Sequence, residues 1–259
     1  MFINGMLESI SRKFQLKFKD IAAAGNILAE IIEDRLKKEK SHECIFVVGV
    51  PRGGVVTANS VIRKLSPSSS SKSVNTSAVY FDIVIPRKLT DPDNKEQAIG
   101  AVMEDGTTYL NQARINMLRI TQEYLQKEKA KQMEQIRYRT ILYSTNLPIN
   151  NSHQHHHHHE NIKDKVIILV DDGAATGATL MVAARWLRKK HSPKRLIIAV
   201  PVAQKDTVRL LKQEADLVEV VTAPPPSNFV SVGQFYQNFE PILDDKVIEI
   251  MRRNWSVLY

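Results

Sequence analysis

Cysteine is nearly absent from the sequence, which has 259 residues and a single thiol, Cys44. One cysteine cannot form a disulfide within the chain, so a disulfide scaffold is excluded. Cys44 precedes the apolar residues 45–48, which predicts that it is buried in the core. No apolar run approaches the roughly 20 residues of a membrane helix, and residues 1–19 alternate apolar with charged side chains, unlike a signal peptide. We therefore expect a cytoplasmic protein without a membrane partner.

Two common nucleotide-binding signatures are also absent. No G-x-x-x-x-G-K-[ST] motif occurs, since no lysine follows Gly177, and no G-x-G-x-x-G motif is present. The chain does have 43% hydrophobic residues, which predicts one globular domain with a substantial core. Its 36 Lys and Arg against 28 Asp and Glu give a net charge of +8. That charge fits a polyanionic metabolite and is also compatible with nucleic acid.

The most informative stretch covers residues 165–180, KVIILVDDGAATGATL. Residues 166–170 are apolar and mostly β-branched, which predicts a strand buried on both faces of a parallel sheet. Asp171 and Asp172 follow at its carboxyl end, where open α/β sheets bind ligands. Small residues and the start of a helix come next, a pattern that binds phosphate through backbone N–H groups and hydroxyls. The two carboxylates should face sugar hydroxyls, a magnesium ion or a developing positive charge.

A second strand, over residues 44–50, runs into Pro51-Arg52-Gly53-Gly54. The glycines let the backbone approach an anion closely, and the guanidinium offers two parallel donors to phosphate. An ordinary turn with a surface arginine explains the same residues. A third strand, over residues 78–85, leads to Arg87 and Lys88, which are either solvated cations or functional groups.

Residues 89–111 carry turn signals and charges without a sustained period, which predicts a long loop with at most a small hairpin. Long loops in compact domains often act as lids. Helices are predicted over residues 20–38, capped by Asp20, and over 111–143, 180–190, 206–214 and 244–253. With strands at 195–200 and 217–222, this alternation predicts an α/β fold with a mostly parallel open sheet flanked by helices.

Residues 144–163 form a low-complexity insertion that contains His153 and a run of five histidines at 155–159. Clustered imidazoles can bind zinc or nickel, but this run lacks fixed geometry and supporting hydrogen bonds. We therefore interpret it as an insertion that is dispensable for the core function. A histidine-mediated metal-binding protein remains one alternative.

Four motifs in order resemble the type I phosphoribosyltransferase family: PRGG at 51–54, RKL at 87–89 with AIGAV at 98–102, DDGAATGAT at 171–179, and VGQFY at 232–236. The branch they resemble is poorly characterised. The resemblance implies a single domain over residues 1–259, with the long mobile loop and a C-terminal hood over residues 223–259. It also implies transfer of a 5-phosphoribosyl group from phosphoribosyl pyrophosphate (PRPP), with Mg²⁺ as cofactor, to a small nitrogenous acceptor.

The resemblance also implies a role for each motif. Asp171 and Asp172 would bind the ribose hydroxyls and, directly or through water, the magnesium ion; Arg87 and Lys88 would act with them in catalysis from the lid. Pyrophosphate would contact Arg52, Gly53 and Gly54. The 5-phosphate would be bound by Ala175, Thr176, Gly177, Ala178 and Thr179.

Two features leave the acceptor unassigned. Gly173 stands where the family commonly has a branched apolar residue, and the aromatic hood matches no acceptor-specific pattern. Phe235 and Tyr236 are most simply core residues, although either could stack on a flat base. A non-catalytic PRPP-sensing regulator that binds RNA is the alternative function, but no added nucleic-acid-binding motif is present. The resemblance also allows a homodimer.

Overall fold

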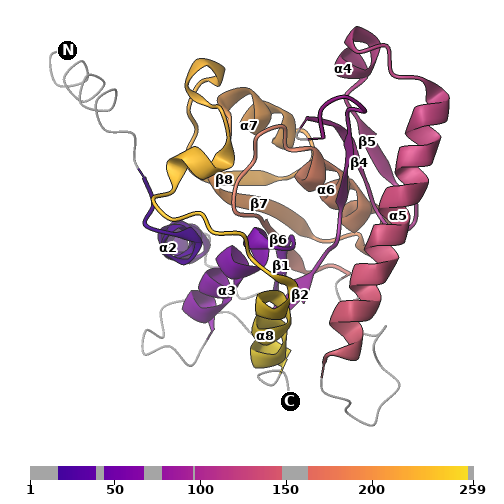
Figure 1. Cartoon of the computed structure of the whole chain (residues 1–259). Coiled ribbons are helices and arrows are strands. Elements are labelled where there is room, and N and C mark those ends of the chain that lie inside the picture. Colours follow the sequence, from indigo (N-terminus) through magenta and orange to yellow (C-terminus); the bar gives the residue numbers. More distant parts are fainter. Residues whose placement is uncertain (1–16, 39–43, 67–77, 96, 148–162, 256–259) are drawn as a thin grey trace, which may run out of the picture.

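A five-stranded parallel sheet forms the centre of the computed structural model, which describes residues 17–38, 44–66, 78–95, 97–147 and 163–255 (Figure 1). The strand order is β2-β1-β6-β7-β8. The strands are β1 (Ile45–Gly49), β2 (Val79–Ile83), β6 (Val166–Val170), β7 (Arg195–Val202) and β8 (Leu217–Thr222). The predicted parallel open sheet is therefore confirmed, and β1 and β6 are fully buried as their apolar runs indicate.

Helices cover both faces of this sheet, and alternate residues of each strand face opposite cores. On one face, Val47 and Ile168 pack against α2 (Ile21–Lys38), α3 (Gly53–Leu65) and α8 (Asp244–Trp255). On the other face, Phe46 and Ile167 pack against α6 (Ala178–His191) and α7 (Lys205–Leu211). Because both faces of the sheet are covered, every residue of a central strand lies in one core or the other, and the strand sequence is a continuous apolar run.

The register of β1 and β6 brings their two motifs together. Gly49 pairs with Val170, so both strands end at the same level and the chain leaves both at the same sheet edge. Strand order changes direction at this point, since β1 lies between β2 and β6. Open α/β sheets bind their ligands at such a switch point, outside the carboxyl ends of the strands.

The prediction of a long loop over residues 89–111 was wrong, although the hairpin it allowed is present as part of a larger sheet. A three-stranded antiparallel sheet of β3 (Arg87–Thr90), β4 (Ala98–Val102) and β5 (Thr108–Leu110) occupies this stretch, followed by α4 (Gln112–Met117) and α5 (Gln122–Thr145). All five residues of β4 are buried, and Ile99 packs in a core with Leu89 and Ile136. Because β4 is buried on both faces, its sequence lacks the alternating pattern that would have identified a strand.

The segment after β8 packs against two different parts of the protein. Residues 226–235 contain two short 3-10 helices, and Phe235 and Tyr236 pack against Phe18 near the amino end of α2. Figure 1 shows this pairing of distant parts of the chain as the indigo and yellow segments that lie side by side, joined by a bridge between Phe18 and Tyr236. After this segment, α8 packs on α3 and β2.

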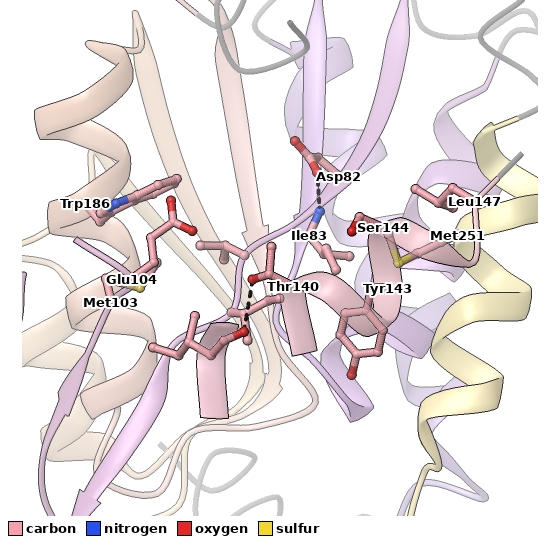
Figure 2. Close-up of a pocket in the computed structure, with 13 residues that line it drawn as sticks. Asp82, Ile83, Met103, Glu104, Thr140, Tyr143, Ser144, Leu147, Trp186 and Met251 are labelled. Carbon is pink, nitrogen blue, oxygen red and sulfur yellow. Dashed lines mark hydrogen bonds between the residues drawn. The ribbon is translucent and has the colours of Figure 1, made fainter. Parts of the chain in front are cut away.

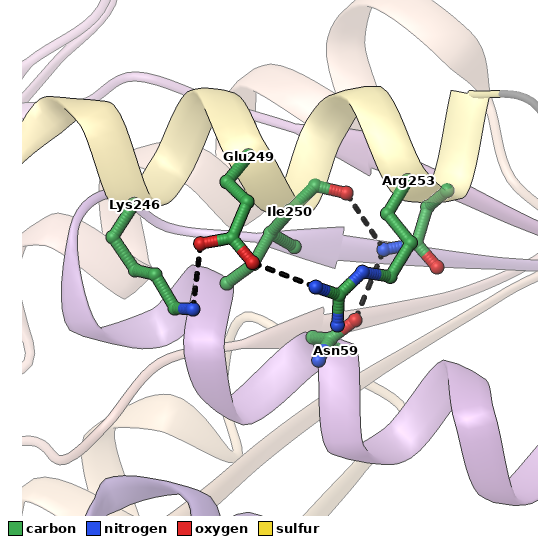
Figure 3. Close-up of polar contacts among 6 residues, drawn as sticks. Asn59, Lys246, Glu249, Ile250 and Arg253 are labelled. Atoms are coloured by element: carbon green, nitrogen blue, oxygen red, sulfur yellow. Dashed lines mark hydrogen bonds and ion pairs between the residues drawn. The ribbon is translucent and has the colours of Figure 1, made fainter.

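α8 is fixed to α3 by a polar contact within its apolar surroundings (Figure 3). The Asn254 Nδ2 group donates to Asn59 Oδ1 at 3.0 Å and to the Ile250 carbonyl at 2.9 Å. On the exposed side, Glu249 pairs with Lys246 at 2.7 Å and with Arg253 at 2.6 Å. Exposed pairs of this kind contribute little stability, so the buried amide contact and the apolar face hold the helix.

Several smaller predictions have clear outcomes. Asp20 caps α2 as predicted, since its Oδ1 atom accepts from the Ala23 N–H at 2.7 Å. Cys44 is half-buried, so its assignment to the core was wrong. The histidine run lies outside the described residues. Among the helices of the described part of the chain, none has the length and apolar character needed to cross a membrane.

Candidate active site

A cavity of about 220 Å³ opens at the carboxyl ends of β1 and β6. Its walls are the residues that follow these strands, together with Lys88 from β3 and Ala98 from β4. The predicted site residues that line it are Arg52, Gly53, Lys88, Asp171, Asp172, Ala175, Thr176, Gly177 and Thr179. Gly54, Ala178 and Arg87 were also predicted and do not line it. Motifs that lie far apart in the sequence thus share one cavity.

The two acids form a buried pair of like charge. Asp171 is 9% exposed, and its Oδ1 atom accepts from the Asp172 N–H at 2.9 Å. Burial, and next the charge of Asp172, raise the pKa of Asp171 well above its usual range. Burial also raises the pKa of Asp172, while Asp171 and Lys88 oppose that rise. Strongly perturbed carboxyl groups in a cavity are typical of functional sites.

The loop after the acids has the geometry of an anion cradle. Gly177 adopts a φ of 70° at the start of α6, a conformation that side chains other than glycine rarely accept. The Thr207 hydroxyl on α7 donates to the Ala175 carbonyl at 2.5 Å, which fixes the loop from outside the motif. Gly177 and Thr179 at the amino end of α6 line the cavity, where the helix dipole favours negative charge.

The Gly-Gly pair after β1 lets residues 51–54 approach Asp171 and Asp172 closely. A Cβ atom on Gly54 would lie 2.7 Å from the Asp171 Cα atom, and one on Gly53 would clash with the Asp172 carboxylate. Any larger residue would separate α3 from the acids. Gly54 therefore acts by close packing behind the cavity, whereas Arg52 and Gly53 reach its surface.

Arg87 and Lys88 have different environments because adjacent residues of a strand point to opposite faces. Lys88 is exposed and lines the cavity, where its charge acts on both acids. The Arg87 Nε atom donates to Gln132 Oε1 on α5 at 3.0 Å. Sequence analysis treated these two cations as equivalent, and the structure separates them.

The segment over residues 229–239 contacts the backbone of the acid pair through Tyr236. The Tyr236 hydroxyl donates to the Asp172 carbonyl at 2.5 Å, and burial raises the pKa of Tyr236. Its ring is 4% exposed and stacks on Phe239, while Phe235 is 2% exposed. Both rings are therefore core residues, and neither offers a free face to a base. No sequence signal identified the Tyr236 hydrogen bond.

Gly173, the unusual residue of the motif, has a packing partner. A Cβ atom at this position would lie 2.5 Å from the Val232 Cγ1 atom and 3.0 Å from the Val202 Cγ1 atom. The branched side chain that the family commonly has here would occupy the same space. The side chain of Val232, in the C-terminal segment, thus fills the space beside Gly173.

Residues 15–240 match the family model described as phosphoribosyl transferase domain, which is most of the chain. The chain belongs to the phosphoribosyltransferase family. A structure titled TT1426, from Thermus thermophilus, has the same fold, with a TM-score of 0.64 and 32% identity over 92% of this chain and 98% of that one.

Two proteins of Mycobacterium tuberculosis, named "Putative phosphoribosyl transferase" in strains CDC 1551 and H37Rv, are each 28% identical over 239 residues. The match covers 91% of this phosphoribosyltransferase chain and 46% of each relative. The chain thus spans about half the length of these relatives.

A second cavity of the phosphoribosyltransferase fold, of about 150 Å³, has different chemistry (Figure 2). It lies between the edge strand β2, α5, α6 and α8, and most of its lining is apolar. Its charged lining groups are the carboxylates of Asp82 and Glu104. Negative charge disfavours a phosphorylated ligand, so the cavity between β1 and β6 is the one suited to phosphate.

Proposed function

We propose that this protein transfers a 5-phosphoribosyl group from PRPP to a nitrogenous, nucleobase-like acceptor and releases pyrophosphate. One observation carries the proposal: a single cavity brings together a phosphate cradle, a pair of carboxylates and an Arg-Gly pair. PRPP has the matching order of groups, with a 5-phosphate, a ribose and a pyrophosphate. The family match supports the same reaction class.

The reaction breaks the bond between ribose C1 and the pyrophosphate oxygen and forms a bond between C1 and the acceptor nitrogen. Pyrophosphate leaves with the electron pair, and the acceptor nitrogen loses its proton. Positive charge develops on the ribose ring as the leaving group departs. In this proposal the carboxylates of Asp171 and Asp172 bind the ribose hydroxyls and stabilise that charge, while Arg52 and Lys88 stabilise the negative charge on pyrophosphate.

The donor set suits a magnesium ion that is bound mainly by the substrate. Within the described residues, no group of three His, Cys, Asp or Glu could hold a metal. Mg²⁺ is usually bound by one or two carboxylates, substrate phosphate oxygens and water. Asp171 and Asp172 can supply that share, directly or through water, and the ion would neutralise charge on the pyrophosphate. A cation beside these acids would also lower their raised pKa values.

The test is an assay of pyrophosphate release with PRPP, magnesium chloride and a panel of bases, which should include purines, pyrimidines, orotate and nicotinate. We expect release that depends on one class of base and on magnesium. Thr179→Val, which removes a hydroxyl from the cradle, should raise the KM for PRPP. Tight PRPP binding with no release for any base would reject the transfer reaction and favour the PRPP-sensing regulator, for which RNA retention is the next measurement.

A further inference from the structure

The loop between β6 and α6 is held by hydrogen bonds to its carbonyl groups. The Ala174 carbonyl accepts from the Gln204 N–H at 3.0 Å, and the next carbonyl, that of Ala175, accepts from the Thr207 hydroxyl at 2.5 Å. Both donors lie outside the loop, the first immediately before α7 and the second within it. Within the described residues, the N–H groups of residues 175–177 donate to no acceptor of the protein. The protein therefore satisfies the carbonyl side of this loop and leaves its N–H side available to another acceptor.

The hydrogen bond of Thr207 is not the usual one for a threonine in a helix. Such hydroxyls commonly donate to the carbonyl three or four residues earlier in the same helix. Thr145 on α5 does so, since its Oγ1 atom donates to the Ile141 carbonyl at 2.8 Å. Thr207 is 3% exposed and donates instead to Ala175, which is 32 residues away. The hydroxyl of Thr207 thus joins α7 to the loop.

This hydrogen bond fixes the direction of the next N–H group along the chain. A trans peptide is planar, and its C=O and N–H groups point in opposite directions. Because the Ala175 carbonyl points toward Thr207, the Thr176 N–H points away from it. Ala175 and Thr176 line the cavity, whereas Thr207 does not. The Thr176 N–H is therefore turned from the α7 side of the loop to the cavity side.

Thr207 also packs directly against the loop through its methyl group. A Cβ atom on Gly177 would lie 2.7 Å from the Thr207 Cγ2 atom. One side chain thus has two contacts with the loop, a hydrogen bond at Ala175 and an apolar contact at Gly177. Substitution can separate them, because valine keeps the shape and loses the hydroxyl, whereas serine keeps the hydroxyl and loses the methyl group.

We propose that Thr207 is a positioning residue for the phosphate cradle: its hydroxyl holds the Ala175 carbonyl away from the cavity and so directs the Thr176 N–H toward the 5-phosphate of PRPP. This inference rests on the proposed function and adds to it a residue from α7 that no sequence motif indicated. If this peptide turned over, its carbonyl oxygen would enter the cavity and oppose the phosphate oxygens, which are also acceptors. The Thr207 hydroxyl therefore selects the donor side of the peptide for the anion.

The experiment measures binding of ribose 5-phosphate by calorimetry to the wild type, Thr207→Val and Thr207→Ser. Because a hydrogen bond to a charged phosphate is stronger than one between neutral groups, we expect Thr207→Val to weaken binding about tenfold. Thr207→Ser should bind as the wild type does, because it keeps the hydroxyl. Thr145→Val is the matched control: it removes a hydroxyl that bonds within an exposed part of α5, and it should leave the affinity unchanged.

A role for Thr207 in packing alone predicts the opposite order of affinities. Thr207→Ser, which loses the methyl contact with Gly177, would then bind ribose 5-phosphate weakly, and Thr207→Val would bind it normally. Thermal unfolding of each variant shows whether the fold is retained. If Thr207→Val does not fold, Thr207→Ser alone decides, since weak binding by this variant rejects the proposal and normal binding supports it. Equal affinities of Thr207→Val and the wild type, or a wild type that does not bind ribose 5-phosphate, would overturn the proposal.

Failure of this inference and failure of the proposed function are distinguishable. If Thr207→Val weakens ribose 5-phosphate binding but no base supports pyrophosphate release by the wild type, the positioning role stands and the transfer reaction is rejected. If the wild type transfers phosphoribosyl groups and Thr207→Val has the same KM for PRPP, the reaction stands and the positioning role is rejected.

Discussion

Replacing Asp171 by asparagine should make the free protein more stable while it greatly lowers activity. The Asp171 Oδ1 atom accepts the Asp172 N–H at 2.9 Å, and an amide oxygen can keep that hydrogen bond. The substitution therefore removes a buried charge with little change in shape. It also removes the repulsion that, with burial, raises the pKa of Asp171.

The size of the gain follows from Coulomb's law. Two carboxylates about 4–8 Å apart, at an effective dielectric constant of about 20, repel each other by about 2–4 kcal/mol. For a chain of this size, each kcal/mol shifts the melting temperature by about 2–4 °C, so Asp171→Asn should raise it by about 4–16 °C at neutral pH. In function, loss of one group that stabilises transition-state charge costs about 10²–10³ in kcat.

The pH dependence has a defined sign. A carboxyl group whose pKa is raised in the folded state destabilises that state as pH rises from the ordinary value of 3.8 through the raised value. The advantage of Asp171→Asn should therefore be absent near pH 4 and complete above the raised pKa. Asp216 provides a control with the opposite sign: despite some burial, the Leu196 N–H and Arg188 lower its pKa. Asp216→Asn should lose stability at neutral pH, and that loss should diminish as pH falls below about 4.

Differential scanning fluorimetry from about pH 2.5 to pH 8, with the range above about pH 4 repeated with magnesium and PRPP, measures all of these effects. A ligand at 100 times its Kd stabilises the folded state by about 2.7 kcal/mol, so PRPP should raise the melting temperature of the wild type but not of Asp171→Asn. If Asp171→Asn is less stable than the wild type at pH 8, or gains the same ligand shift, the acids are structural and the electrostatic argument is wrong.

Three further substitutions test the surroundings of the acids. Gly173→Val should destabilise the fold by about 1–3 kcal/mol in thermal unfolding because its side chain meets Val232, and adding Val232→Ala should restore most of the loss; no recovery would mean that the two do not compete for space. Tyr236→Phe should cost about 1 kcal/mol, since it removes the hydrogen bond to the Asp172 carbonyl, and an unchanged melting temperature would contradict that value. Deleting residues 153–159 should change neither the melting temperature nor its shift with PRPP, because closure entropy depends weakly on loop length; a loss of either would assign the histidines a role.

Local sequence was sufficient for the sheet and for the motifs that line the candidate site. Apolar runs over residues 45–48 and 166–170 predict strands because both faces of a parallel sheet are buried. Because β1 and β6 pair in parallel, their carboxyl ends lie at the same edge of the sheet, and this brings Arg52 near Asp171. Strand ends and glycine-rich turns are local features, so the motifs at these ends could be recognised before the fold was known.

Tertiary contacts decide the parts that were missed. The segment 98–102 has no alternating pattern because both of its faces are buried, one against α6 and the other in the core with α5. Arg87 and Lys88 carry the same charge in sequence, and only the pleat of β3 separates the cavity side from the α5 side.

The cavity holds charges of both signs, and within the described residues Asp171 and Asp172 form no ion pair with Arg52 or Lys88. Burial and the charge of Asp172 raise the pKa of Asp171, so the two acids repel each other in the free protein. This repulsion costs stability, and a cation bound beside the acids would offset it. The proposed ligand, PRPP with magnesium, has matching charges, because its metal and hydroxyl groups suit the carboxylates while its pyrophosphate suits Arg52 and Lys88. If the proposed reaction takes place there, the same fixed charges stabilise the positive charge on the ribose and the negative charge on pyrophosphate as the two separate, which lowers the barrier without reorganisation of the site.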